Sequence, residues 1–242
     1  MSNATHLSNG LIELENEPSQ TLSFEETVRA RRSFRSFLPT PVPNAQIKQV
    51  LEDAQYSPSN CNTQPWNTHI VSGEKIKELG RILTEQNEAE NFTPDFSFDM
   101  ECFYGAYSER RIEHGKTFYE AMGVARGDKI ARHKAAAKNY TFYGAPHVAL
   151  LFMPSFGDNV RVGGDIGMYG QTFLLPLTAR GLGGIPQTAI GFFAQTIREY
   201  LGISDELKLM FAIAFGYPDF TAPVNSVRMG RVPVSESVTF HH

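Results

Sequence analysis

The sequence predicts an α+β fold rather than a doubly wound α/β fold. Segments in which apolar residues recur at helical spacing outnumber the short apolar or β-branched runs typical of strands, and the two kinds do not alternate regularly. The 242 residues are enough for one large domain or two small ones. Because no repeat and no linker divides them, we expect a flexible arm over residues 1–22 and one domain over residues 23–242.

Local start and stop signals place the predicted elements. Ser23 and Glu26 have the spacing of a capping box, which begins a short helix. Asn44 is expected to cap a second helix, which stops at Ser57-Pro58 because the residue before proline disfavours helical backbone angles. Further helices are expected over residues 74–86, 107–122, 128–139, 165–180 and 195–201, and strands over residues 68–72, 147–153 and 209–216.

Composition and charge argue against several classes of function. Lys and Arg number 22 against 26 Asp and Glu, and the resulting net charge of −4 lacks the basic field that nucleic-acid binding requires. The charge-poor residues 166–197 are broken by Gly, Gln and Pro, which argues against a membrane span. Two cysteines cannot build a disulfide framework and the N-terminus has no signal-peptide pattern, so we expect a cytoplasmic protein. The seven histidines show no metal-ligand spacing, and no metal site is expected.

Two polar motifs in the N-terminal half suggest a ligand site. Arg31, Arg32, Ser33 and Arg35 stand close together without an intervening acid, which makes a donor cluster suited to phosphate; a solvated basic surface is the alternative. The motif SPSNCNTQPW over residues 57–66 collects amides and hydroxyls between prolines. Its polar groups need partners, which a heterocycle with carbonyl oxygens and ring nitrogens would supply. A surface turn with a packed Trp66 is the alternative.

Two further motifs lie in the C-terminal half. GLGGIPQT over residues 181–188 contains GxGG, but it follows a helix and not a strand, so its context does not fit a dinucleotide-binding fold. Its last three residues add polar donors to an apolar segment. NSVRMGRVP over residues 225–233 carries Arg228 and Arg231, which either return to the first arginine cluster or are ordinary surface arginines.

These four motifs, in this order and spacing, resemble the FMN-dependent nitroreductase family. The resemblance rests on RARRSFRSF, SPSNCNTQPW, GLGGIPQTA and NSVRMGRVP and covers most of residues 24–235. It implies a three-layer α+β fold in which helices flank a central, mostly antiparallel sheet. It also implies an intertwined homodimer with one FMN in each of two sites at the interface. Residues 234–240 would then wrap around the partner and add a strand to its sheet.

The same resemblance implies roles for individual residues. Arg31, Ser33 and Arg231 match positions that hold the FMN phosphate, and Arg32 and Arg35 match positions near the ribityl chain and the pyrimidine edge of the ring. Pro58, Ser59, Asn60 and Asn62 match the loop that reaches FMN from the other subunit, and Gln64 resembles a ring or ribityl contact. Pro186, Gln187 and Thr188 match the stretch beside the reactive N5 edge.

The chain also departs from one family subgroup at two places. Gln187-Thr188 stands where that subgroup has Glu-Gly, and Met229 stands where it has lysine. Arg228 is the candidate that replaces the missing charge.

The resemblance assigns residues 91–140 to an insertion that forms a lid and a substrate pocket. Its candidate pocket residues are Phe103, Tyr104, Tyr107, Arg111, Phe118 and Tyr119. The implied activity is a ping-pong, two-electron reduction of nitroaromatics, quinones or related acceptors by NADH or NADPH. One alternative is reductive dehalogenation or dehydrogenation of a carboxylate-bearing metabolite, which the basic residues of the insertion would hold. Another is a non-catalytic binder of phosphorylated ligands.

Overall fold

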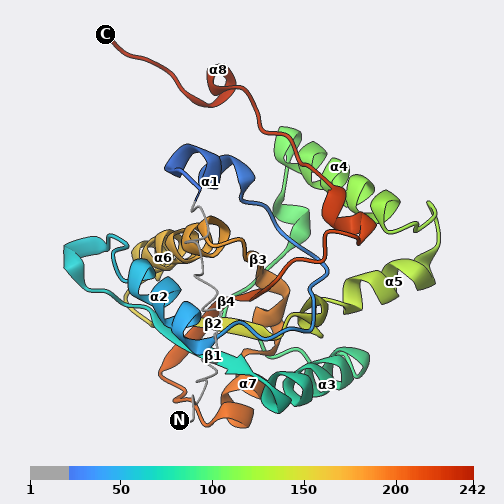
Figure 1. Cartoon of the computed structure of the whole chain (residues 1–242), viewed down its shortest axis with the longest axis horizontal. Coiled ribbons are helices and arrows are strands. Elements are labelled where there is room, and N and C mark those ends of the chain that lie inside the picture. The colour runs from blue at the N-terminus through green and yellow to red at the C-terminus, as the bar shows by residue number, and fades with distance from the viewer. Residues whose placement is uncertain (1–21) are drawn as a thin grey trace, which may run out of the picture.

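The computed structural model describes residues 22–242, and its centre is a four-stranded antiparallel sheet (Figure 1). The strands are β1 (Asn67–Ser72), β2 (His147–Pro154), β3 (Gly183–Gln187) and β4 (Leu207–Gly216), and they lie in the order β1-β2-β4-β3. The pairing of β2 with β4 skips Met210, which therefore forms a bulge in β4. The edge strand β3 ends at Gln187, whose partner in β4 is Ala212.

Helices cover both faces of the sheet, which confirms the expected three-layer α+β architecture. The helices are α1 (Phe24–Ala30), α2 (Asn44–Ala54), α3 (Glu74–Glu88), α4 (Gly105–Ala121), α5 (Lys129–Ala137), α6 (Val160–Ala179), α7 (Ala194–Leu201) and α8 (Val234–Ser237). α2 and α6 pack on one face of the sheet, and α3 and α7 on the other. α4 and α5 lie beyond the end of β3 as an outer pair (Figure 1).

The alternation of side chains along β2 divides the core in two. Val148, Leu150 and Phe152 face α3 and α7, whereas Ala149 and Leu151 face α2 and α6. All five side chains are fully buried. A strand that is apolar on both faces is typical of the middle of a sheet with helices on both sides, and this explains the unbroken apolar run in the sequence.

Several local predictions hold and others need correction. The capping box is confirmed: Ser23 Oγ accepts from Glu26 N at 3.3 Å, and Ser23 N donates to Glu26 Oε2 at 2.9 Å. Asn44 is not a cap, because the helix follows Pro43 directly and has no side-chain cap. α6 begins at Val160, five residues earlier than predicted.

Strand β3 is absent from the sequence-based prediction, because two glycines and a proline are poor strand formers. Packing requires those glycines. A Cβ on Gly183 would lie 2.5 Å from Phe34 Cδ2, and one on Gly184 would lie 2.8 Å from Leu174 Cδ2. The close approach of Phe34 to β3 therefore depends on the absence of a side chain at Gly183, and the close approach of α6 depends on its absence at Gly184.

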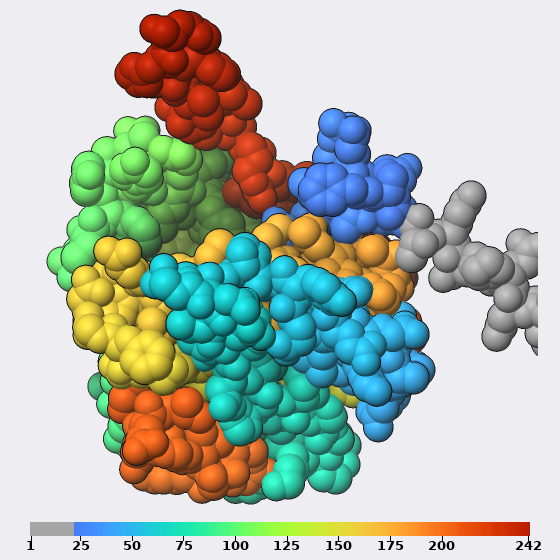
Figure 2. Space-filling view, turned by 90° about the vertical axis from the view of Figure 1, so that its left-hand side faces the viewer, coloured from blue at the N-terminus to red at the C-terminus, as the bar shows by residue number. Residues whose placement is uncertain are grey.

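In the isolated chain, residues 234–240 do not form the strand that is expected to join the sheet of a partner subunit. Residues 234–237 form the short helix α8 and not a strand, and the segment projects from the body of the molecule (Figure 2). Val234, Val238 and Phe240 are exposed. A lone segment has no strand to pair with, which accounts for the difference. The predicted arm lies, except for Leu22, outside the described residues. Between residues 22 and 242, no helix is long and apolar enough to cross a bilayer.

Candidate functional site

The residues after α1 run alongside strand β3. Ser33 forms an isolated parallel bridge with Gly184, and Phe34 N donates to Gly184 O at 3.3 Å. Phe34 is buried against Gly183. This packing fixes the backbone between Arg31 and Arg35 at the edge of the sheet, so that their side chains extend beside β3.

Six arginines from two distant segments line one cavity of about 720 Å³, here called the arginine pocket. They are Arg29, Arg31, Arg32, Arg35, Arg228 and Arg231, and Ser33, His114 and Gln171 also line it. No carboxylate is among its lining residues. The structure thus brings the first and fourth sequence motifs together, and Arg228 and Arg231 are not ordinary surface arginines.

The pocket has a surplus of positive charge that the protein does not neutralise. Arg29 pairs with Glu25 at 3.7 Å, whereas the other five arginines have no carboxylate within 4.0 Å in residues 22–242. Burial, and then the charge of Arg231, lower the pKa of Arg31; burial and the charge of Arg228 do the same to the pKa of Arg32. Nε of Arg32 is buried without a hydrogen-bond partner. An anion with several acceptor oxygens would satisfy these donors.

A buried asparagine holds the two arginine segments together. Oδ1 of Asn225 accepts from Arg35 N, and its Nδ2 donates to Ser36 O and to Asp219 O, each at 2.8 Å. Asn225 is 3% exposed. The residue begins the fourth sequence motif, but nothing in a single sequence indicates which backbone it would bind.

The side chain of Arg35 contacts the insertion. Its guanidinium lies over the ring of Phe118, 4.9 Å from the centroid, and its Nη2 lies 3.3 Å from Nε2 of His114. Burial raises the pKa of Tyr143, and the charge and hydrogen bond of Arg35 partly offset that rise. His114 and Tyr143 are functional candidates that sequence reasoning missed, because each is far from Arg35 along the chain.

The loop that contains Pro58, Ser59, Asn60, Asn62 and Gln64 does not line the arginine pocket of its own chain. It packs on α6, where Asn60 N donates to Asp165 Oδ1 at 3.0 Å. Trp66 stacks on Tyr169 with 4.8 Å between ring centroids. Ser59 Oγ accepts from Gln64 N at 2.9 Å, which stabilises the turn. The side chains of Asn60, Asn62 and Gln64 are exposed.

The segment Pro186–Thr188 ends β3 and enters a 3₁₀ turn, with successive side chains on opposite sides. Pro186 and Thr188 are exposed. Gln187 is 2% exposed, its Nε2 donates to Asn139 O at 2.9 Å, and its Oε1 has no partner. The Gln187 side chain therefore points to the end of the insertion, so that at the exposed edge Gln187 offers only its backbone, beside the exposed side chains of Pro186 and Thr188.

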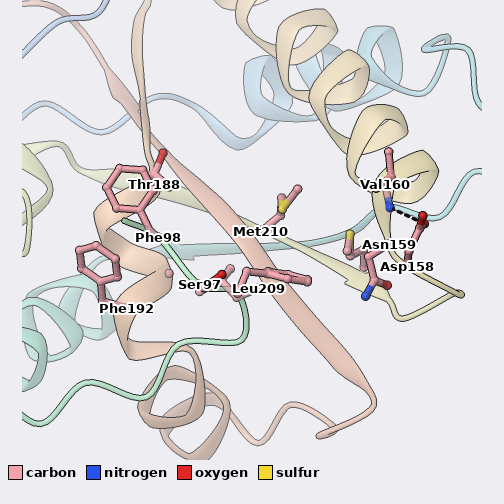
Figure 3. Close-up of a pocket in the computed structure, with 12 residues that line it drawn as sticks. Ser97, Phe98, Asp158, Asn159, Val160, Thr188, Phe192, Leu209 and Met210 are labelled. Carbon is pink, nitrogen blue, oxygen red and sulfur yellow. Dashed lines mark hydrogen bonds between the residues drawn. The ribbon is translucent and has the colours of Figure 1, made fainter. Parts of the chain in front are cut away.

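A second, mainly apolar cavity of about 340 Å³ adjoins Thr188 (Figure 3). Phe98 and Phe192 lie on one side, the first turn of α6 lies on the other, and the bulged Met210 lies between them. The start of the insertion is fixed here by Asp95, whose Oδ2 accepts from Arg198 Nη1 at 2.5 Å and from Leu209 N at 2.8 Å.

The six predicted substrate-pocket residues line neither cavity. Phe103, Tyr104, Tyr107 and Arg111 are exposed on the insertion, Phe118 contacts Arg35, and Tyr119 packs against Phe118 and Arg132. Their role in substrate binding stays a prediction. Within residues 22–242, no cluster of three or more His, Cys, Asp or Glu side chains is arranged to hold a metal ion.

Comparison with known proteins identifies the family of this chain. A family model described as "Nitroreductase family" matches residues 28–217. The chain belongs to the nitroreductase family. Nitroreductase NfnB of Mycolicibacterium smegmatis is 40% identical over 216 residues, which are 89% of this chain and 92% of that protein. The 4-nitrobenzoate reductase of Pseudomonas putida is 32% identical over 213 residues, 87% of this chain and 92% of that enzyme.

A solved structure extends the likeness of this nitroreductase-family chain to three dimensions. The FMN-dependent nitroreductase NfnB from Mycobacterium smegmatis, in complex with NADPH, superimposes with a TM-score of 0.87 at 39% identity, over 90% of this chain and 97% of that one. Family membership and fold, both expected from the four motifs, are therefore confirmed.

Proposed function

We propose that this protein is an FMN-dependent oxidoreductase that transfers two electrons, in a ping-pong reaction, from NADPH or NADH to nitroaromatics, quinones or related electron-poor acceptors. The observation that carries the proposal is the arginine pocket, with five guanidiniums that no carboxylate of residues 22–242 neutralises. Its relatives are named as nitroreductases. These names favour nitro reduction over dehalogenation.

The residues of the pocket fit FMN. A phosphate dianion would neutralise the mutually repelling Arg31 and Arg231, and a ribityl or ring oxygen of FMN would accept from the buried, unpartnered Nε of Arg32. Arg31, Ser33 and Arg231 would hold the phosphate, while Arg32 and Arg35 would face the ribityl chain and the pyrimidine edge. FMN, when bound, supplies the two-electron carrier.

The protein contributes binding, orientation and charge. Fixed positive charge beside the pyrimidine edge favours the addition of electrons there, an effect typically worth about 3 kcal/mol in preorganised sites. The bridge between Ser33 and Gly184 sets Ser33 beside β3, whose exposed Pro186 and Thr188 would be available to contact the FMN ring. The apolar cavity next to Thr188 would exclude water from one side of that edge.

A homodimer completes the proposed site. The exposed amides of Asn60, Asn62 and Gln64 do not reach the arginine pocket of their own chain, and would serve the partner's FMN. The projecting C-terminal segment exposes Val238 and Phe240, which would be covered by the second subunit. We expect a dimer in size-exclusion chromatography with light scattering, and a weaker dimer after removal of residues 233–242.

The proposed activity is tested with the purified full-length chain. We expect yellow protein whose flavin absorbance is bleached anaerobically by NADPH and restored by one equivalent of 4-nitrobenzoate or a quinone. Matched assays with NADH determine the preferred nucleotide. A colourless protein that fails to bind added FMN contradicts the proposal, and so does a yellow protein that NADPH and NADH both fail to reduce. The second result would support a non-catalytic binder instead.

A further inference from the structure

Helix α4 contacts the arginine pocket through a histidine that has no role in the function proposed above. Nε2 of His114 lies 3.3 Å from Nη2 of Arg35. Four residues further along the helix, the ring of Phe118 lies beneath the same guanidinium. Because residues four apart share one face of a helix, α4 presents both an acceptor and an aromatic face to Arg35.

The chemistry of the two side chains determines which form of His114 this contact requires. Arginine has five N–H donors and no acceptor, so Nε2 of His114 must be unprotonated in order to accept from Nη2. A protonated imidazole has only donors, and it would place a second positive charge beside Arg35. His114 is largely exposed, but its partial desolvation, and then the charge of Arg35, lower its pKa from the ordinary 6.5.

The charged groups around His114 do not favour its protonated form. Arg35 and the other arginines face it from the pocket, which has no carboxylate among its lining residues. On α4 itself, Arg110 and Arg111 precede it by one turn, and the adjacent Glu113 and the nearby Lys116 are exposed and opposite in charge. The backbone of Arg35 is held separately by Asn225. Protonation of His114 therefore affects the guanidinium and α4, not the anchor of the pocket.

We propose that His114 is a positioning residue for Arg35 and that its neutral form fastens helix α4 onto the arginine pocket. Acidification breaks the Arg35–His114 hydrogen bond and leaves two cations in contact, so α4 separates from the pocket. Arg35 then keeps Phe118 and Tyr143 to orient its guanidinium. The inference rests on the proposed function only for the position of Arg35 beside FMN, since the contact itself belongs to the free protein.

Three variants separate the parts of this proposal. His114→Gln keeps an acceptor of similar reach but does not titrate. His114→Phe keeps a ring but can neither accept a hydrogen bond nor titrate. His133→Gln is the matched control, because His133 is an exposed histidine on the neighbouring helix α5. Backbone hydrogen exchange of residues 105–121 is measured by mass spectrometry at pH 5 and pH 8 on FMN-free protein, and corrected for the intrinsic exchange rate.

We expect wild type and His133→Gln to lose about 10-fold protection in α4 at pH 5, the factor that corresponds to one hydrogen bond to a charged group. His114→Gln should stay protected at both pH values, and His114→Phe should be unprotected at both. Equal protection of wild type at the two pH values would overturn the proposal, as would an acid loss in His114→Gln as large as that of wild type. Because FMN is absent, failure of the cofactor proposal would leave this result interpretable.

As a second readout, the Arg35→Met variant removes the charge that faces His114. In FMN-free protein, NMR titration of the imidazole should show a higher pKa for His114 in this variant than in wild type. An unchanged or lower value would show that Arg35 does not control the histidine.

Discussion

The substitution Arg31→Gln should have opposite effects on the free and the FMN-bound protein. Arg31 is partly buried beside Arg231, and both its burial and that second charge disfavour its protonated form. No carboxylate within 4.0 Å compensates it in the described part of the chain. In the absence of an anion, the substitution therefore removes a repulsion and a desolvation penalty while keeping a long polar side chain.

The expected magnitudes follow from these surroundings. Relief of one like-charge contact near the surface is worth about 0.2–1 kcal/mol, so the free variant should be at least as stable as wild type. A hydrogen bond to a charged group is worth about 1.5–3 kcal/mol, so FMN affinity should fall about 10- to 150-fold. At a concentration of 100 times its dissociation constant, FMN stabilises wild type by about 2.7 kcal/mol, and a 10-fold weaker variant gains only about 1.4 kcal/mol.

The assay is urea unfolding followed by circular dichroism at fixed protein concentration, with and without FMN, together with FMN titration by fluorescence quenching. Arg29→Gln is the control, because Arg29 lines the same pocket but already pairs with Glu25 and is 80% exposed at its side chain. Its effect on FMN affinity should stay below about 5-fold. The reasoning fails if Arg31→Gln destabilises the free protein by more than about 1 kcal/mol or if it binds FMN as tightly as wild type.

Three further outcomes are expected. Asp95→Ala should destabilise the protein by about 3–5 kcal/mol in urea unfolding, because it leaves the buried Arg198 with only the exposed Asp205 as a counter-ion, while Asp95→Asn should cost less. Gln187→Glu buries a carboxylate against the carbonyl of Asn139 and should lower the thermal midpoint above pH 6, with recovery in acid as the group is protonated. Burial lowers the pKa of His147 from 6.5 in the folded protein. As the pH falls, the unfolded chain therefore binds a proton at this residue before the folded chain does. The stability contribution of neutral His147 is thus complete above about pH 6.5 and lost below it, and His147→Gln should flatten that part of the profile of unfolding free energy against pH.

The sequence alone predicts those features that depend on neighbouring residues. The apolar run of β2 and the capping box at Ser23 can be predicted, because a buried central strand and a capped helix each leave a local pattern in the sequence. Strand β3 is not predictable in this way, since Gly183 is a poor strand former and is needed because Phe34 and Pro218 pack against it. Propensity reports what a residue favours alone, and tertiary packing overrides it.

Within the site, the arginines were predictable and their partners were not. A run of arginines without intervening acidic residues is evident from the sequence. The contact of Arg35 with His114 is not, because it joins residues 79 positions apart. The direction of Gln187 could not be predicted either. It depends on the register of β3 with β4, which decides which side chains of the strand face inward.

The arrangement of neutral and charged groups indicates how the chain keeps an unneutralised pocket folded. The backbone around the arginines is held by contacts that do not involve the guanidiniums: the capping box before α1, the bridge from Ser33 to Gly184, and the three hydrogen bonds of Asn225. None of these contacts needs an anion. The guanidiniums themselves repel one another, so a bound anion adds stability without being required for the fold. It follows that the protein should fold without FMN and gain stability on binding it. Asn225→Ala leaves Arg35 N without its acceptor and removes one of the two hydrogen bonds to Ser36 O and to Asp219 O, so this variant should unfold more easily whether FMN is present or not.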